Sequence, residues 1–123
     1  MIAYSTLGTN DLTRAAEFYD ALLAEVGAGR ALEMDRLIAW AAGAGQPMFA
    51  VCTPENGDAA SVGNGTMIAL AGANAAAVDS LHAKAMSLGA TDEGAPGLRG
   101  DAFYLAYVRD LDGNKLAFFA PAG

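Results

Sequence analysis

The sequence contains one order of elements twice, and this internal duplication constrains the fold more than any other feature. In the first copy, residues 4–7 are typical of a short strand, and apolar residues then recur at helical spacing from Leu12 to a stop at Gly27. In the second copy, residues 67–70 are strand-like, and a similar apolar stripe ends at Gly89. The first strands are sixty-three positions apart. We therefore expect two similar modules.

Segments with the sequence pattern of strands follow each predicted helix. Residues 36–40 and 47–54 follow the first helix, and residues 103–108 and 115–121 follow the second. Between the last two strands, residues 110–114 (Asp-Leu-Asp-Gly-Asn) have the composition of a tight turn and predict a hairpin loop. The fold class that we expect is α+β, as a single domain spanning residues 1–123 with one module at about 1–55 and the other at about 65–123.

Alternation along these strands predicts two faces for each sheet. One parity is almost entirely large and apolar, and we expect the helices to cover it: Leu7, Phe49, Val51, Ile68, Leu70, Leu116 and Phe118. The other parity mixes polar, small and aromatic side chains: Tyr4, Thr6, Met48, Ala50, Cys52, Met67, Ala69, Lys115, Ala117 and Phe119. This mixture is typical of a partly open, concave binding surface, so any site is expected there.

Charge and composition exclude several functions. Seven Lys and Arg against fourteen Asp and Glu give a net charge of −7, which argues against nucleic acid or an anionic membrane as the main partner. Apolar runs are too short to span a bilayer, and the N-terminus lacks a secretory signal pattern, so we expect a cytoplasmic protein. The one cysteine, Cys52, excludes an internal disulfide and cysteine-based zinc clusters.

Several segments together resemble a known superfamily. Residues 4–12 (Tyr-Ser-Thr-Leu-Gly-Thr-Asn-Asp-Leu) with Phe18-Tyr19, and residues 107–116 (Tyr-Val-Arg-Asp-Leu-Asp-Gly-Asn-Lys-Leu), are similar to the opening and closing signatures of the vicinal oxygen chelate superfamily. This superfamily holds glyoxalases, bleomycin-resistance proteins and extradiol dioxygenases. Residues 64–70 and 92–99 resemble its small glyoxalase-like bacterial branch. The resemblance implies tandem βαβββ modules whose sheets curl around a cleft.

The resemblance also implies where a divalent metal would bind. Metal-dependent members supply ligands, typically His, His or Gln, and Glu, from positions that correspond here to Tyr4, Met67 and Ala117. The fourth, symmetry-related position is Ala50. A neutral phenol is a poor ligand, a thioether suits copper(I) better than zinc or iron, and alanine has no donor atom. A catalytic metal needs about three protein ligands. We therefore expect no metal and no cofactor.

Other chemistry-bearing residues have ordinary structural interpretations. His82 is the only histidine and lies on the flank of a predicted helix, where a partly buried structural role is favoured over catalysis. Cys52 has no histidine near it in the pattern to activate its thiol. Residues 110–113 lack the twelfth-position glutamate of an EF-hand, so a turn is favoured over a calcium site. Glu33 and Asp35 fit a solvated strand edge better than an acid pair.

Aromatic and basic residues complete the predicted site. Tyr4, Trp40, Tyr104 and Phe119 are candidates for stacking surface, although Trp40 fits a core position equally well. Arg99 follows a Gly-rich segment, where it would pair with an anionic ligand or lie on the surface. The ligand-binding residues that we predict are Tyr4, Thr6, Trp40, Met48, Cys52, Met67, Arg99, Tyr104, Lys115, Ala117 and Phe119.

Two functions of different classes follow from these observations. The first is a metal-independent binder of a small, neutral or mildly anionic, partly aromatic molecule, in a cleft between the modules of a chain that forms a homodimer. The second is a lyase or dioxygenase-type enzyme that uses an unrecognised metal or a metal-free mechanism based on Tyr4 or Tyr104. A third alternative is a structural or regulatory dimer without a small ligand. The catalytic residues of an enzyme are not identified by the sequence.

Overall fold

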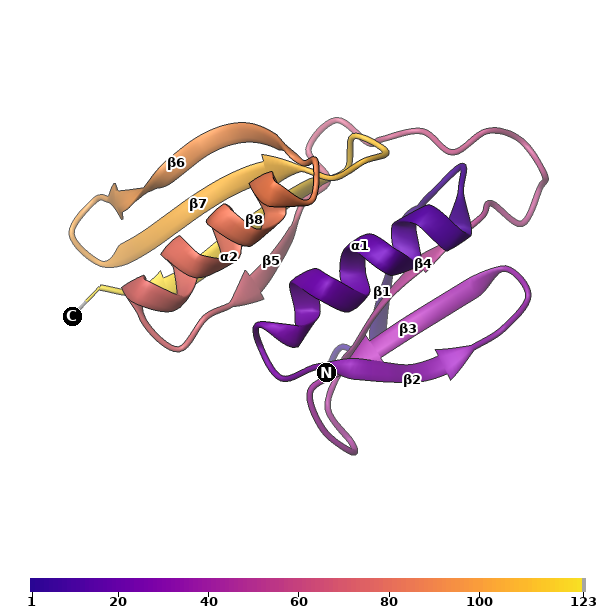
Figure 1. Ribbon diagram of the computed structural model, residues 1–123, viewed down its shortest axis with the longest axis horizontal. Coiled ribbons are helices and arrows are strands. Elements are labelled where there is room, and N and C mark those ends of the chain that lie inside the picture. The colour runs from indigo at the N-terminus through magenta and orange to yellow at the C-terminus, as the bar shows by residue number, and fades with distance from the viewer. Residues whose placement is uncertain (123) are drawn as a thin grey trace. The chain divides into compact units, whose positions relative to one another are not determined.

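The computed structural model describes residues 1–122 as two compact units, Met1–Val62 and a second unit that begins at Gly63. Each unit has the order strand, helix, strand, strand, strand (Figure 1). The α+β class and the tandem βαβββ organisation are therefore confirmed. The change of unit falls in the segment between the two predicted modules.

The first unit is a four-stranded mixed sheet with one helix. Its sheet order is β1-β4-β3-β2, with β1 parallel to β4 and the other pairs antiparallel. The elements are β1 (Tyr4–Gly8), α1 (Leu12–Ala24), β2 (Gly29–Glu33), β3 (Leu37–Ala41) and β4 (Met48–Cys52).

The second unit has the same topology, with sheet order β5-β8-β7-β6 and a parallel β5–β8 pair. Its elements are β5 (Ile68–Ala71), α2 (Ala75–Ser87), β6 (Thr91–Arg99), β7 (Phe103–Arg109) and β8 (Lys115–Pro121). In Figure 1, α2 lies along one face of this sheet, and the helix contacts β6, β7 and β8.

Strand register confirms the duplication residue by residue. Thr6 pairs with Ala50 across β1 and β4, and Ala69 pairs with Ala117 across β5 and β8. Ala69 is the predicted equivalent of Thr6, and Ala117 that of Ala50. The internal alignment read from the sequence is therefore the alignment of the two sheets.

Local signals fix both helices at the predicted places. Asp11 caps α1 by accepting a hydrogen bond from the backbone N–H of Arg14 at 3.1 Å, and Asn74 caps α2 by accepting one from Ala77 at 2.9 Å. After the helices the chain turns at Gly27 and Gly89, whose φ angles of 74° and 101° favour glycine.

Each unit buries its apolar parity under its own helix. In the first unit, the ring of Tyr19 on α1 lies 4.7 Å from that of Phe49 and 5.8 Å from that of Trp40. In the second, Val78 and Leu81 of α2 are fully buried with Leu116, Phe118 and other apolar residues of the sheet. The opposite face of each sheet carries no helix of its own unit. Among residues 1–122, no helix has the length and apolar character needed to cross a membrane.

Two strands of the sheets, β2 and β6, lack the sequence pattern of a strand. All five residues of β2 are exposed, so the strand has no apolar alternation. β6 contains Gly94, Pro96 and Gly97, residues that are depleted in strands, and its pairing with β7 shifts register between Asp92 and Gly97. Tertiary pairing with β7 overrides the weak local preference.

Candidate functional site

The helix-free face of the first sheet carries the predicted polar and small residues. Tyr4 pairs with Met48, and Thr6 pairs with Ala50, so these side chains share one face of the β1–β4 ladder, together with Cys52. The side chain of Tyr4 is exposed, whereas Ala50 is fully covered by its neighbours. We call this the first open face. Four predicted ligand-binding residues, Tyr4, Thr6, Met48 and Cys52, are brought together on it.

The corresponding face of the second sheet, the second open face, is more aromatic and more basic. Ala117 pairs with Tyr107, and Phe119 pairs with Leu105, so these four side chains lie on the same side as Lys115. Arg99 pairs with Phe103 on that side, and the rings of Phe103 and Phe119 are 5.3 Å apart. The predicted residues Arg99, Lys115, Ala117 and Phe119 are thus on one face.

Tyr107 lies on this face and is absent from the predicted set, as are Phe103 and Leu105. The guanidinium carbon of Arg99 lies 5.6 Å from the centroid of the Tyr107 ring, and the Lys115 Nζ lies 5.2 Å from it. Parity was sufficient to find it, because Tyr107 is three residues from Tyr104 and must point to the opposite side of β7.

Trp40 and Tyr104 do not lie on the open faces, so their predicted place in the site is corrected. Trp40 pairs with Phe49 on the helix side, is 1% exposed, and donates from Nε1 to Asp20 of α1 at 2.8 Å. Tyr104 pairs with Ala120 and donates its hydroxyl hydrogen to Asp79 of α2 at 2.6 Å. That hydrogen bond is the main cause of the raised pKa of Tyr104. Both side chains join a helix to its sheet.

The four positions that the resemblance assigns to metal ligands do not provide a donor set. Ala50 and Ala117 are fully buried and have no donor atom. Tyr4 is exposed at the start of β1, and Met67 is exposed just before β5. Elsewhere in residues 1–122, no three His, Cys, Asp or Glu side chains are grouped to hold a metal ion. The residues present do not fit a divalent metal centre.

The remaining polar candidates have structural partners. His82 Nε2 lies 2.9 Å from Asp92 Oδ1, and this bond is the main reason that the pKa of Asp92 is lowered. The Asp110 carboxylate accepts hydrogen bonds from the backbone N–H groups of Asp112 and Asn114, both at 2.9 Å, and closes the β7–β8 hairpin. These contacts agree with the structural interpretations of the sequence. Cys52 is a half-buried free thiol.

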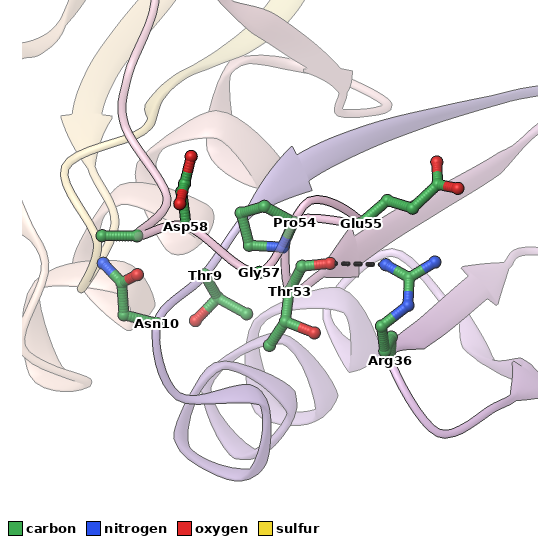
Figure 2. Close-up of a pocket in the computed structure, with 9 residues that line it drawn as sticks. Thr9, Asn10, Arg36, Thr53, Pro54, Glu55, Gly57 and Asp58 are labelled. Atoms are coloured by element: carbon green, nitrogen blue, oxygen red, sulfur yellow. Dashed lines mark hydrogen bonds between the residues drawn. The ribbon is translucent and has the colours of Figure 1, made fainter.

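A further hollow lies in the first unit where β1 and β4 end near the start of α1 (Figure 2). It has a volume of about 370 Å³ and is lined by Thr9, Asn10, Arg36, Thr53, Pro54, Glu55, Gly57, Asp58 and Ala59. Arg36 donates to the backbone oxygen of Thr53 at 2.8 Å, and Asn10 accepts from the N–H of Ala60 at 2.7 Å. These polar groups tie the loop after β4 to the end of the sheet. None of the predicted ligand-binding residues lines this hollow.

Comparison with solved structures identifies the family. A glyoxalase/bleomycin resistance protein from Albidiferax ferrireducens T118 is 36% identical, with a TM-score of 0.89 and 97% of each chain covered. The chain belongs to the glyoxalase/bleomycin resistance protein family. This agrees with the resemblance to the vicinal oxygen chelate superfamily.

Other family structures are more distant in sequence and share the fold. A lactoylglutathione lyase from Agrobacterium tumefaciens is 22% identical, with a TM-score of 0.71 and coverage of 97% of this chain and 92% of its own. A glyoxalase/bleomycin resistance protein/dioxygenase family enzyme from Burkholderia phytofirmans PsJN is 17% identical, with a TM-score of 0.76 and 95% of each chain covered. No family model and no curated protein matches this glyoxalase-family chain.

Proposed function

We propose that this glyoxalase-family protein binds a small organic molecule on the open faces of its sheets and does so without a divalent metal. The observation that carries the proposal is the chemistry at the four positions of the family's metal ligands. Ala50 and Ala117 remove two possible donors, and Tyr4 and Met67 supply only a phenol and a thioether. A surface of aromatic and small side chains that lacks a set of metal donors supports binding of an organic molecule.

The composition of the first open face supports this function. Tyr4 presents a ring and a hydroxyl group to solvent, and Met48 beside it is a flexible apolar side chain. Cys52 lies on the same face of the ladder but has no histidine partner, because His82, the chain's one histidine, is bonded to Asp92 in the other unit. The face offers contact area and hydrogen bonding, and no activated nucleophile.

Tyr4 is the first residue to test. A thermal-shift screen of metabolites and antibiotics on the parent protein should yield stabilising compounds. The Tyr4→Ala variant should bind them about tenfold more weakly, which corresponds to about 1.4 kcal/mol. Met34→Ala is the matched control, because Met34 is an exposed apolar residue of the same unit that lies outside the β1–β4 ladder. It should leave affinity unchanged.

Two results would contradict the proposal. Equal stabilisation of the parent and Tyr4→Ala proteins by every compound would place the ligand away from the first open face. Sustained turnover of a glutathione hemithioacetal or a catechol would favour the alternative function, a lyase or dioxygenase. A cytoplasmic location and a homodimer belong to the same proposal, and sedimentation of the purified protein tests the dimer.

A further inference from the structure

Two cationic side chains of the second open face are directed at one aromatic ring. β6 and β8 are the two neighbours of β7, so Arg99 and Lys115 approach Tyr107 from strands on its two sides. The guanidinium carbon and the ammonium nitrogen lie 5.6 Å and 5.2 Å from the ring centroid. All three side chains are half-buried. Two like charges near one ring repel each other, and the ring offsets only part of this repulsion.

Neither cation is neutralised by a carboxylate of residues 1–122. Within residues 1–122, Arg99 and Lys115 take part in no ion pair, although acidic residues outnumber basic ones by fourteen to seven. Lys115 contributes to lowering the pKa of Glu93, whose carboxylate accepts a hydrogen bond from Arg109. That bond is the main cause of the lowered pKa of Glu93, and the electrostatic effect of Lys115 is smaller. A local excess of positive charge therefore remains on a strongly acidic protein.

The irregular strand β6 is shaped to hold this arrangement. A Cβ atom at Gly94 would lie 2.9 Å from Tyr107 Cδ2 and 3.3 Å from Arg99 Nη2, and one at Gly97 would lie 3.2 Å from Arg99 Nη1. The two glycines thus leave room for the guanidinium group to lie along the strand. Arg99 Nη2 also donates to the backbone oxygen of Ala95 at 2.8 Å, which fixes the group in place. The cation is oriented rather than free in solvent.

An apolar surface continues the same face. The rings of Phe103 and Phe119 are in contact, and Ala117, which pairs with Tyr107, is fully buried and adds no polar group. From this juxtaposition we propose that the second open face binds an organic anion, a carboxylate or phosphate carried on an apolar body. Arg99 and Lys115 bind the anionic group at the rim of the Tyr107 ring, and the aromatic pair contacts the body. The inference rests on the proposed small-molecule function and names its ligand class.

Nuclear magnetic resonance titration of the full chain tests this proposal with three probes of similar size. Phenyl phosphate and phenylacetate distinguish the two kinds of anion, and benzyl alcohol is the neutral comparison. At least one anion should shift the amide signals of Tyr107 and Lys115 saturably, and benzyl alcohol should bind at least about tenfold more weakly. Arg99→Gln and Lys115→Gln should each lower the affinity for the anion by about tenfold.

Lys84→Gln is the matched control, because Lys84 lies in the last turn of α2 and its loss changes the net charge equally. Tyr107→Phe keeps the ring and should retain binding. It therefore shows that a substitution on this face does not abolish binding merely by unfolding the protein. Failure of both anions to saturate, or equal weakening by Lys84→Gln, would overturn the inference. If both anions fail to bind while neutral compounds from the metabolite screen still depend on Tyr4, the anion site is overturned and the proposed function stands.

Discussion

Asp110 is expected to contribute more to stability than any other acidic residue of the second unit. Asp110 and Asn114 are 6% and 5% exposed. The carboxylate accepts from the backbone N–H groups of Asp112 and Asn114 at 2.9 Å, and from Asn114 Nδ2 at 3.1 Å. These bonds shape the hairpin that sets Arg109 opposite Lys115 and so fixes the register of the second open face.

Asp110→Ala removes this acceptor, so the backbone N–H and the Nδ2 group of Asn114 each lose a hydrogen bond. A hydrogen bond contributes about 1 kcal/mol net, and a buried donor without a partner costs about 1–3 kcal/mol. Since the amide of Asp112 is nearer to solvent, we expect a total loss of about 2–4 kcal/mol in the free energy of unfolding. That is a large fraction of the roughly 5–15 kcal/mol typical of a small protein.

Urea denaturation followed by circular dichroism measures this loss. With a slope of about 1–3 kcal/mol per molar urea, the midpoint should fall by roughly 1–2 M. Asp101→Ala is the control, because Asp101 is an exposed acidic residue in the β6–β7 turn and its loss should cost less than about 0.5 kcal/mol. A loss below about 1 kcal/mol for Asp110→Ala, or equal losses for the two variants, would refute the reasoning.

Three other predictions test the core and the helix–sheet contacts. Leu81→Ala should lower the free energy of unfolding by about 2–4 kcal/mol, because Leu81 is 1% exposed. Met86→Ala, on the exposed side of the same helix, should cost less than about 0.5 kcal/mol. Urea denaturation measures both losses, and equal losses would contradict the packing of α2. The pKa of Asp20 is lowered mainly by its hydrogen bond from Arg30, so the ionised carboxylate stabilises the folded state above the ordinary pKa of about 4 and loses this effect as the pH falls. The stability difference between parent and Asp20→Asn should therefore shrink below about pH 4, and a difference constant from neutral to acid pH would contradict it. Because the pKa of Tyr104 is raised, Tyr104→Phe should remove a phenol that titrates above about pH 10. Titration followed by ultraviolet absorbance measures this, and the loss of a phenol that titrates at lower pH would be inconsistent with the hydrogen bond from Tyr104 to Asp79.

The duplication made most of this fold predictable. The strand parities and the Asp110 turn are local signals that are confirmed, and the caps at Asp11 and Asn74 are local as well. Strand β6 could not be assigned, because its Gly94 and Gly97 disfavour strands and only pairing with β7 holds them there. Local signals identify an element when the chain's own chemistry, rather than a distant partner, decides its conformation.

The candidate site was predictable only in part. Parity places Tyr4, Lys115 and Phe119 on open faces, whereas an aromatic ring by itself does not indicate a face. Tyr104 has the ring without the parity, and of the two tyrosines of β7 only Tyr107 shares the parity of Arg109 and faces the open side. The approach of Arg99 to Tyr107 is a contact between two strands and has no sequence pattern of its own.

The central claim is that this family member binds its ligand without a divalent metal. Elemental analysis of protein purified without chelator, after equilibration with zinc, nickel, manganese and iron(II) and removal of the excess, tests it most directly. Because Tyr4, Met67, Ala50 and Ala117 supply no adequate donor set, we predict far less than one metal ion per chain. About one tightly bound divalent ion per chain would contradict the account.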